Sequence, residues 1–234
     1  MIAHWIRKLS SSMCLLGLAL FANGCTKQPG DAVSAAIPAG LATDPANPVA
    51  VKNGNPPAAA AKAISFKDVV QTNAEVPPGL DGLVFLDTNG RRVALKSYFG
   101  KKNVVLVFTE GFSGALCPFC KTQTSRLIEN YDKLQAMDTE VLVVYPGARE
   151  HVDEFIDAAK RTEKQQVDEV PFPIVLDEDM IAVDFFKIRS NLAHPSTYII
   201  DKKGNIGLAY VGKDMSADRP SIKAIFTQID AVNK

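Results

Sequence analysis

Two cysteines, Cys117 and Cys120, have the residue type and spacing best suited to chemistry, with Pro118 and Phe119 between them. If a helix begins here, this spacing places both sulfurs on its first turn, close enough to form a disulfide. The positive end of a helix favours a thiolate at the capping position, which predicts a lowered pKa for Cys117. Pro118 suits the first helical position because an N–H would have no partner there. We therefore expect Cys117 to be the nucleophile and Cys120, which should be more buried, to be the resolving thiol.

Two other interpretations of the cysteine pair need to be weighed. A zinc site needs four ligands, and after Cys25 the chain offers only His151 and His194 beside the pair. An inert structural disulfide is the second interpretation, and a position between a strand and a helix argues against it. We therefore expect no metal and no cofactor other than the redox-active pair itself.

The sequence around the pair predicts alternating strands and helices. Val104–Thr109 is a continuous apolar run rich in β-branched residues, typical of a strand buried on both faces. Pro118–Ala136 follows with apolar residues at helical spacing. Asp218–Val232 is expected to be the closing helix, with Asp218 as its cap. The remaining strands are expected at 83–86, 92–95, 140–145, 172–176, 196–201 and 206–211, and the remaining helices at 150–161 and 179–186.

The N-terminus resembles a bacterial secretory signal of the lipoprotein type. His4, Arg7 and Lys8 precede an apolar run over residues 13–22, which is about half as long as a membrane-spanning helix must be. The run ends in a sequence that resembles a lipoprotein cleavage box, so Cys25 is expected to be the first mature residue and to carry acyl chains. The alternative is an ordinary secretory signal that leaves Cys25 as a spare thiol. The prediction is a lipid-anchored protein of the cell envelope, facing the periplasm, and the Thr that follows Cys25 indicates the outer membrane.

Composition divides the rest of the chain into a tether and one domain. Residues 26–63 are dominated by Ala, Pro, Asn and Gly and lack aromatic residues, so they cannot bury enough surface to offset the entropy of ordering. The chain has 26 basic and 26 acidic residues, and this balance argues against a nucleic-acid-binding protein. The predicted organisation is a signal peptide over 1–24, a lipidated Cys and tether over 25–63, and one domain over 64–234.

The domain resembles a known family from about Val76 to Lys234. The matching stretches are LVFLDTNGRRVALKSYFGKKNVVLVFTEGF, CPFC, PFPIVLDED and PSTYIIDKKGNIGLAYVG. They resemble the alkyl hydroperoxide reductases and thiol-specific antioxidants within the thioredoxin-like superfamily. This resemblance implies an α/β thioredoxin-like fold, with a central mixed sheet flanked by helices and an N-terminal β-hairpin extension. It also implies a thiol-dependent enzyme that reduces peroxides or disulfides and takes electrons from a thiol donor protein.

The resemblance leaves peroxide and disulfide open as substrates. Peroxidase relatives carry Pro seven residues before the first cysteine, Thr or Ser three residues before it, and an Arg nearby in space. Here Glu110 and Gly114 occupy the first two places, and Arg126 and Arg189 are the candidate arginines. Disulfide-exchanging relatives instead place a cis-proline opposite a CxxC pair, and Pro195 matches that proline.

Several other side chains are candidates for supporting roles. His194 could stabilise the Cys117 thiolate or accept its proton, or else be a loop histidine exposed to solvent. Glu110 could relay protons to Cys120 if it is buried, or else lie in solvent. An apolar rim for partner docking, with core packing as the alternative, is expected from Phe112, Leu116 and Phe119.

A different functional class also fits the same residues. Some thioredoxin-fold proteins of the cell envelope deliver copper through two cysteines and a distant histidine, and soft thiolates suit Cu(I). Cys117, Cys120 and His194 would form this set. Such proteins usually place three residues between the cysteines, whereas this chain has two, which weakens the copper hypothesis.

Overall fold

The computed structural model describes residues 64–213 and 217–234, all of which belong to the unit Pro57–Lys234. The predicted signal peptide, the lipidation site Cys25 and the tether lie outside the described residues. Within the described part of the chain, no helix has both the length and the apolar character needed to cross a membrane.

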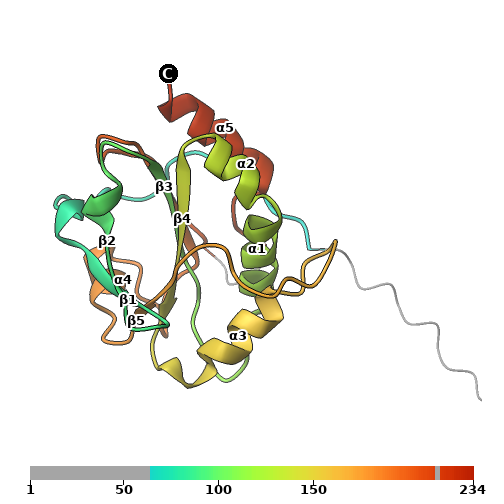
Figure 1. The fold of residues 1–234 in the computed structure, drawn as a ribbon. Coiled ribbons are helices and arrows are strands. Elements are labelled where there is room, and N and C mark those ends of the chain that lie inside the picture. The colour runs from blue at the N-terminus through green and yellow to red at the C-terminus, as the bar shows by residue number, and fades with distance from the viewer. Residues whose placement is uncertain (1–63, 214–216) are drawn as a thin grey trace, which may run out of the picture. The chain divides into compact units, whose positions relative to one another are not determined.

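A single mixed sheet of seven strands forms the centre of the domain, in the order β2-β1-β5-β4-β3-β6-β7 (Figure 1). β4 pairs in parallel with β3 and β5, and every other pairing is antiparallel. The predicted N-terminal hairpin is therefore part of this sheet and reaches it through β5. The strands are β1 Val84–Asp87, β2 Arg92–Ala94, β3 Asn103–Phe108, β4 Thr139–Pro146, β5 Ile174–Asp177, β6 Ser196–Ile200 and β7 Ile206–Val211.

Helices cover both faces of the sheet, with α1, α2, α3 and α5 on one face and α4 on the other (Figure 1). They are α1 Pro118–Glu129, α2 Tyr131–Ala136, α3 Val152–Ala159, α4 Ile181–Phe185 and α5 Ile222–Val232. Short 3₁₀ turns add η1 Leu80–Gly82, η2 Leu95–Tyr98 and η3 Arg149–His151. This arrangement confirms the predicted α/β thioredoxin-like class.

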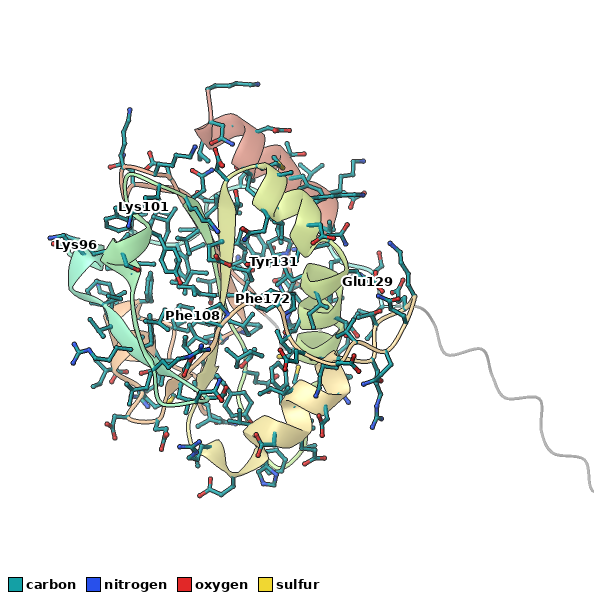
Figure 2. All side chains as sticks on the ribbon, in the orientation of Figure 1. Lys96, Lys101, Phe108, Glu129, Tyr131 and Phe172 are labelled. Carbon is teal, nitrogen blue, oxygen red and sulfur yellow. The ribbon has the colours of Figure 1, made fainter. Side chains whose placement is uncertain are left out.

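The central strands supply two cores because successive side chains point to opposite faces. Every residue of β3 is buried. Val105 and Val107 pack with the four-helix face, whereas Phe108 packs on the α4 face. Figure 2 shows Tyr131 and Phe172 close together on the helical side, and their ring centroids are 5.5 Å apart.

The helix predicted over 118–136 is wrong in one respect, because it breaks at Asn130 into α1 and α2. Asn130 leaves the helical conformation at φ −111°, ψ 10°. Its side-chain amide donates to the carbonyl of Arg126 at 2.8 Å, while its backbone N–H turns to Leu127 O at 3.2 Å. The side chain thus takes the carbonyl that the backbone N–H of Asn130 itself would use in a continuous helix.

The closing helix begins later than predicted, and Asp218 is not its cap. Ser221 is the cap, and its hydroxyl accepts the N–H of Ala224 at 3.2 Å. Arg219 precedes Pro220, and the ring of a proline disfavours helical backbone in the residue before it. Asp218, Arg219 and Pro220 consequently lie outside the helix, which has consequences for the site described below.

Residues 64–73, here called the N-terminal segment, run beside α5 and β7. Lys67 forms a parallel bridge with Pro220. Further along, Asn73 donates its N–H to Ala209 O at 2.9 Å and accepts the N–H of Val211 at 2.8 Å. The segment therefore occupies the outer edge of β7, the last strand of the sheet.

Candidate active site

The cysteine pair lies at the N-terminus of α1, as the sequence predicts. Cys117 is the cap residue, with extended backbone at φ −63°, ψ 115°, and Pro118 is the first helical residue. The sulfur of Cys117 accepts the backbone N–H of Cys120 at 3.3 Å. A thiol therefore fills the capping role that a Ser or Asp side chain commonly has.

Both cysteines are free thiols in this structure, and they differ in burial. Cys117 is 9% exposed and Cys120 is 2% exposed, which confirms the expectation that the second cysteine is the more buried. Both sulfurs lie within 4.8 Å of each other and of a carboxylate oxygen of Glu110. The backbone N–H of Glu110 also donates to the sulfur of Cys120 at 3.4 Å.

Arg219 is the residue of the site that sequence reasoning missed. It is 1% exposed, and its Nη2 donates to the sulfur of Cys120 at 3.3 Å and to that of Cys117 at 3.5 Å. Its guanidinium also lies over the ring of Phe119, 5.6 Å from the centroid. A buried cation placed on two thiols stabilises a thiolate. The sequence contained one signal for this position. Arg219 precedes Pro220, and a proline disfavours helical backbone in the residue before it, so Arg219 is kept out of the first turn of the helix.

The two arginines considered from the sequence have other partners. Arg126 donates to Glu163 at 3.1 Å and to the carbonyl of Ile64 at 2.7 Å. Arg189 forms two hydrogen bonds with the carboxylate of Asp184, at 2.5 and 2.6 Å. Neither of them forms a hydrogen bond with the cysteines.

The thiols titrate as a pair that shares one proton. Burial opposes ionisation of Cys120, but the hydrogen bond from Cys117, the charge of Arg219 and the N–H of Glu110 outweigh it and lower the pKa of Cys120 to about 7. The hydrogen bond to Cys120, together with burial, raises the pKa of Cys117. The expectation of a low pKa at Cys117 is therefore corrected, because the hydrogen bond between the two thiols keeps the shared proton on Cys117.

Glu110 is buried, as a proton relay requires, at 9% exposure just after β3. The hydroxyl of Ser113 approaches its carboxylate at 3.4 Å. With an oxygen close to both sulfurs, this carboxylate is well placed to exchange a proton with the pair.

Pro195 is buried immediately before β6, whose first residue, Ser196, pairs with Phe108 at the end of β3. Continuing this register places Pro195 at the same end of the sheet as Glu110. Its carbonyl accepts the N–H of Gly212 at 2.8 Å. The cis bond expected at Pro195 stays a prediction.

His194 does not join the cysteines in a metal-binding cluster. In the described part of the chain, the ligand atoms within 4.8 Å of one another here belong to Glu110, Cys117 and Cys120. His194 is half-buried, and its backbone N–H donates to Ile188 O at 2.7 Å. The copper hypothesis, which needs His194 beside both sulfurs, stays a prediction.

The three rim residues are half-buried around the thiols and also pack against the core. Phe112 and Leu116 form an antiparallel bridge that closes the loop between β3 and α1. The ring of Phe112 stacks on His151, with centroids 3.6 Å apart. Both functions considered for the rim are therefore compatible with where these side chains lie.

Comparisons with known proteins identify the family. The model of the AhpC/TSA family matches residues 72–209. No curated protein matches this chain. The described fold is similar to a yeast mitochondrial 1-Cys peroxiredoxin, at 18% identity over 70% of this chain and 77% of the other, with a TM-score of 0.55.

Two further solved structures share the fold at low identity. A mitochondrial 2-Cys peroxiredoxin from Plasmodium falciparum is 19% identical over 70% of this chain and 94% of the other, with a TM-score of 0.52. The peroxidoxin BcpB from Mycobacterium tuberculosis is 14% identical over 65% and 94%, also with a TM-score of 0.52. Since the family model covers more than half of the sequence, the chain belongs to the AhpC/TSA family and is a thiol-dependent oxidoreductase with a thioredoxin-like fold.

Proposed function

We propose that the Cys117–Cys120 dithiol reduces peroxides, that the pair becomes an intramolecular disulfide, and that a thiol donor protein restores it. The observation that carries this proposal is the guanidinium of Arg219, which donates to both free thiols at the start of α1. Membership of the AhpC/TSA family supports peroxide as the substrate class.

The first step begins with a proton transfer inside the pair. Cys120 holds the thiolate in the resting dithiol, and it accepts the proton of the more exposed Cys117. The Cys117 thiolate then attacks one peroxide oxygen, so that an S–O bond forms and the O–O bond breaks. The leaving oxygen takes up the proton that Cys120 had accepted, by way of the Glu110 carboxylate close to both sulfurs, and departs as an alcohol or as water; Cys120 is thereby a thiolate once more.

The second step closes the disulfide. Cys120, again ionised beside Arg219, attacks the sulfur of the Cys117 sulfenic acid. The S–S bond forms, the S–O bond breaks, and the hydroxide takes up a proton and leaves as water. Two thiols of a donor then reduce the disulfide by thiol–disulfide exchange and are themselves oxidised to a disulfide.

Direct reduction of disulfides is the second candidate, favoured by the position of Pro195 before β6 at the same end of the sheet as the thiols. Cys117 would attack a substrate disulfide, and Cys120 would release the mixed disulfide. Copper delivery through Cys117, Cys120 and His194 gains no support from the described geometry.

The experiment compares oxidation of the reduced protein by hydrogen peroxide and by a small disulfide, followed by stopped-flow fluorescence and mass spectrometry. We expect faster reaction with peroxide, loss of reaction in Cys117→Ser, and accumulation of a sulfenic acid in Cys120→Ser. A faster reaction with the disulfide would reassign the substrate class. Undiminished oxidation of Cys117→Ser at Cys120 would overturn the proposed order of attack.

We also propose that the protein is a lipoprotein of the bacterial cell envelope, anchored through acyl chains on Cys25 and facing the periplasm. The support is the basic start, the short apolar run and the small residues before Cys25. A tether of about 38 residues would let the domain reach partners roughly 35 Å from the bilayer.

A further inference from the structure

The backbone of Arg219 is held by the N-terminal segment. Lys67 donates its N–H to the carbonyl of Arg219 at 2.8 Å, and its own carbonyl accepts the N–H of Ser221 at 2.8 Å. The arginine thus lies in a short parallel bridge between two segments that are far apart in the sequence. Val70, three residues further along, packs in the same core cluster as both cysteines.

A buried carboxylate next to Arg219 strengthens this arrangement. Asp218 is 9% exposed and forms an ion pair with Lys67. It also accepts the hydroxyl of Tyr210 at 2.5 Å and the backbone N–H of Lys213 at 2.8 Å. Although burial opposes ionisation, the hydrogen bonds from Lys67 and Tyr210 lower the pKa of Asp218 to about 2, so it is charged at neutral pH.

The chain is closely packed at this point, which limits how far Arg219 could move. A Cβ placed on Gly212 would lie 2.6 Å from the carbonyl oxygen of Asp218 and 3.1 Å from that of Pro195. The end of β7, the approach to β6 and the segment before α5 therefore meet with no room for a side chain.

We propose that Lys67 and Asp218 are positioning residues for the redox pair, because together they hold Arg219 over the sulfurs of Cys117 and Cys120. The N-terminal segment is then part of the redox site as well as its connection to the rest of the chain. The proposal rests on the proposed dithiol function but not on which oxidant the dithiol reduces.

If these residues are replaced, the equilibrium between the dithiol and the disulfide of the pair should change. A well-placed cation stabilises the thiolate of the dithiol and has no comparable charge to stabilise in the disulfide. When the arginine is less well placed, the dithiol becomes less acidic and the equilibrium with glutathione moves toward the disulfide.

The test is a double-mutant cycle of Asp218→Asn and Arg219→Met in the full chain. Two readouts are used, the rate of alkylation by iodoacetamide at neutral pH and the dithiol–disulfide equilibrium with glutathione. We expect Asp218→Asn to slow alkylation roughly five-fold, as expected when a half-ionised thiol becomes mostly protonated, and to favour the disulfide. In the Arg219→Met background, the same substitution should change neither readout further.

Two more variants complete the experiment. Lys67→Met removes the ion pair at its half-exposed partner and is expected to give a milder version of the same effect. This variant keeps the proposal testable if Asp218→Asn folds poorly. Asp68→Asn is the matched control, since Asp68 belongs to the same segment but accepts the hydroxyl of Ser221. Equal effects of Asp218→Asn with and without Arg219 would overturn the proposal, and so would an equal effect of Asp68→Asn. Neither readout uses peroxide, so a failure of the proposed peroxidase function would be seen separately.

Discussion

At the scale of single residues, the redox centre is a pair of thiols whose protons are not independent. Arg219 and the N–H of Glu110 favour the charge on Cys120, and the thiol of Cys117 is hydrogen-bonded to that charge. In the proposed mechanism the inner cysteine acts as the base for the outer one. The charge thus lies on the inner sulfur, whereas the position at the positive end of a helix would lead one to expect it on the capping cysteine.

The stability of the reduced protein should depend on pH through this pair. Cys120 ionises near 7 in the folded protein, whereas a thiol of the unfolded chain ionises near 9.0. Between these values the unfolded state binds more protons, so the free energy of unfolding should rise with pH, by up to about 3 kcal/mol. That gain is lost as the pH falls through 7. Above 9 the free energy should fall again, because Cys117 keeps its proton in the folded protein.

Urea denaturation of the reduced protein from about pH 6 to about pH 10 measures this dependence. The disulfide form is the control, since it has no thiol proton to release at this site. A difference between the two forms that does not vary with pH would contradict the coupled pair.

The sequence predicted Cys117, Pro118 and Cys120 at the helix start because their relations are local and follow from capping and spacing. It did not predict Arg219, which is 102 residues from Cys117 and reaches the sulfurs only through tertiary packing. Burial of Glu110 was considered from the sequence but could not be decided there, because burial depends on elements that are distant in the chain.

At the scale of elements, the strands were predicted within a few residues because runs of buried residues mark them directly. The two wrong helix boundaries have specific causes. Asn130 breaks a helix by bonding a backbone carbonyl with its side chain, and Pro220 delays a helix by constraining Arg219. Because Pro220 delays the helix, Arg219 lies outside it and supplies the positive charge of the site.

The loop between β3 and α1 depends on Gly111. This residue has φ +77°, and a Cβ there would lie 2.5 Å from the backbone oxygen of Pro146. We expect Gly111→Ala to lower the free energy of unfolding by about 2 kcal/mol or more and to slow alkylation of the pair, since Glu110 would move with the loop.

Gly114→Ala is the matched control for the loop. Gly114 also has positive φ, at +101°, but nothing lies within 4 Å of a Cβ placed on it. Gly114→Ala should therefore lower the free energy of unfolding by only about 1 kcal/mol, through backbone strain. Urea denaturation of both variants checks this, and equal losses would show that the contact with Pro146 is unimportant.

At the scale of the whole molecule, the lipoprotein proposal predicts how the protein partitions. In a bacterial host, wild-type protein should enter the detergent phase of a Triton X-114 extraction, while Cys25→Ala should stay in the aqueous phase or keep its signal peptide. Cys14→Ala is the control, because Cys14 lies in the segment that cleavage would remove. If Cys25→Ala partitions like the wild type, the anchor is elsewhere.

The bonds that Asn73 makes along β7 also bear on how copies of the protein behave when crowded. The edge strand of a sheet has unpaired backbone N–H and C=O groups with which a second molecule can pair, and such pairing can lead to insoluble fibres. Here Asn73 already occupies the outward groups of Ala209 and Val211. A neighbouring molecule would have to displace this segment before it could pair with that part of β7.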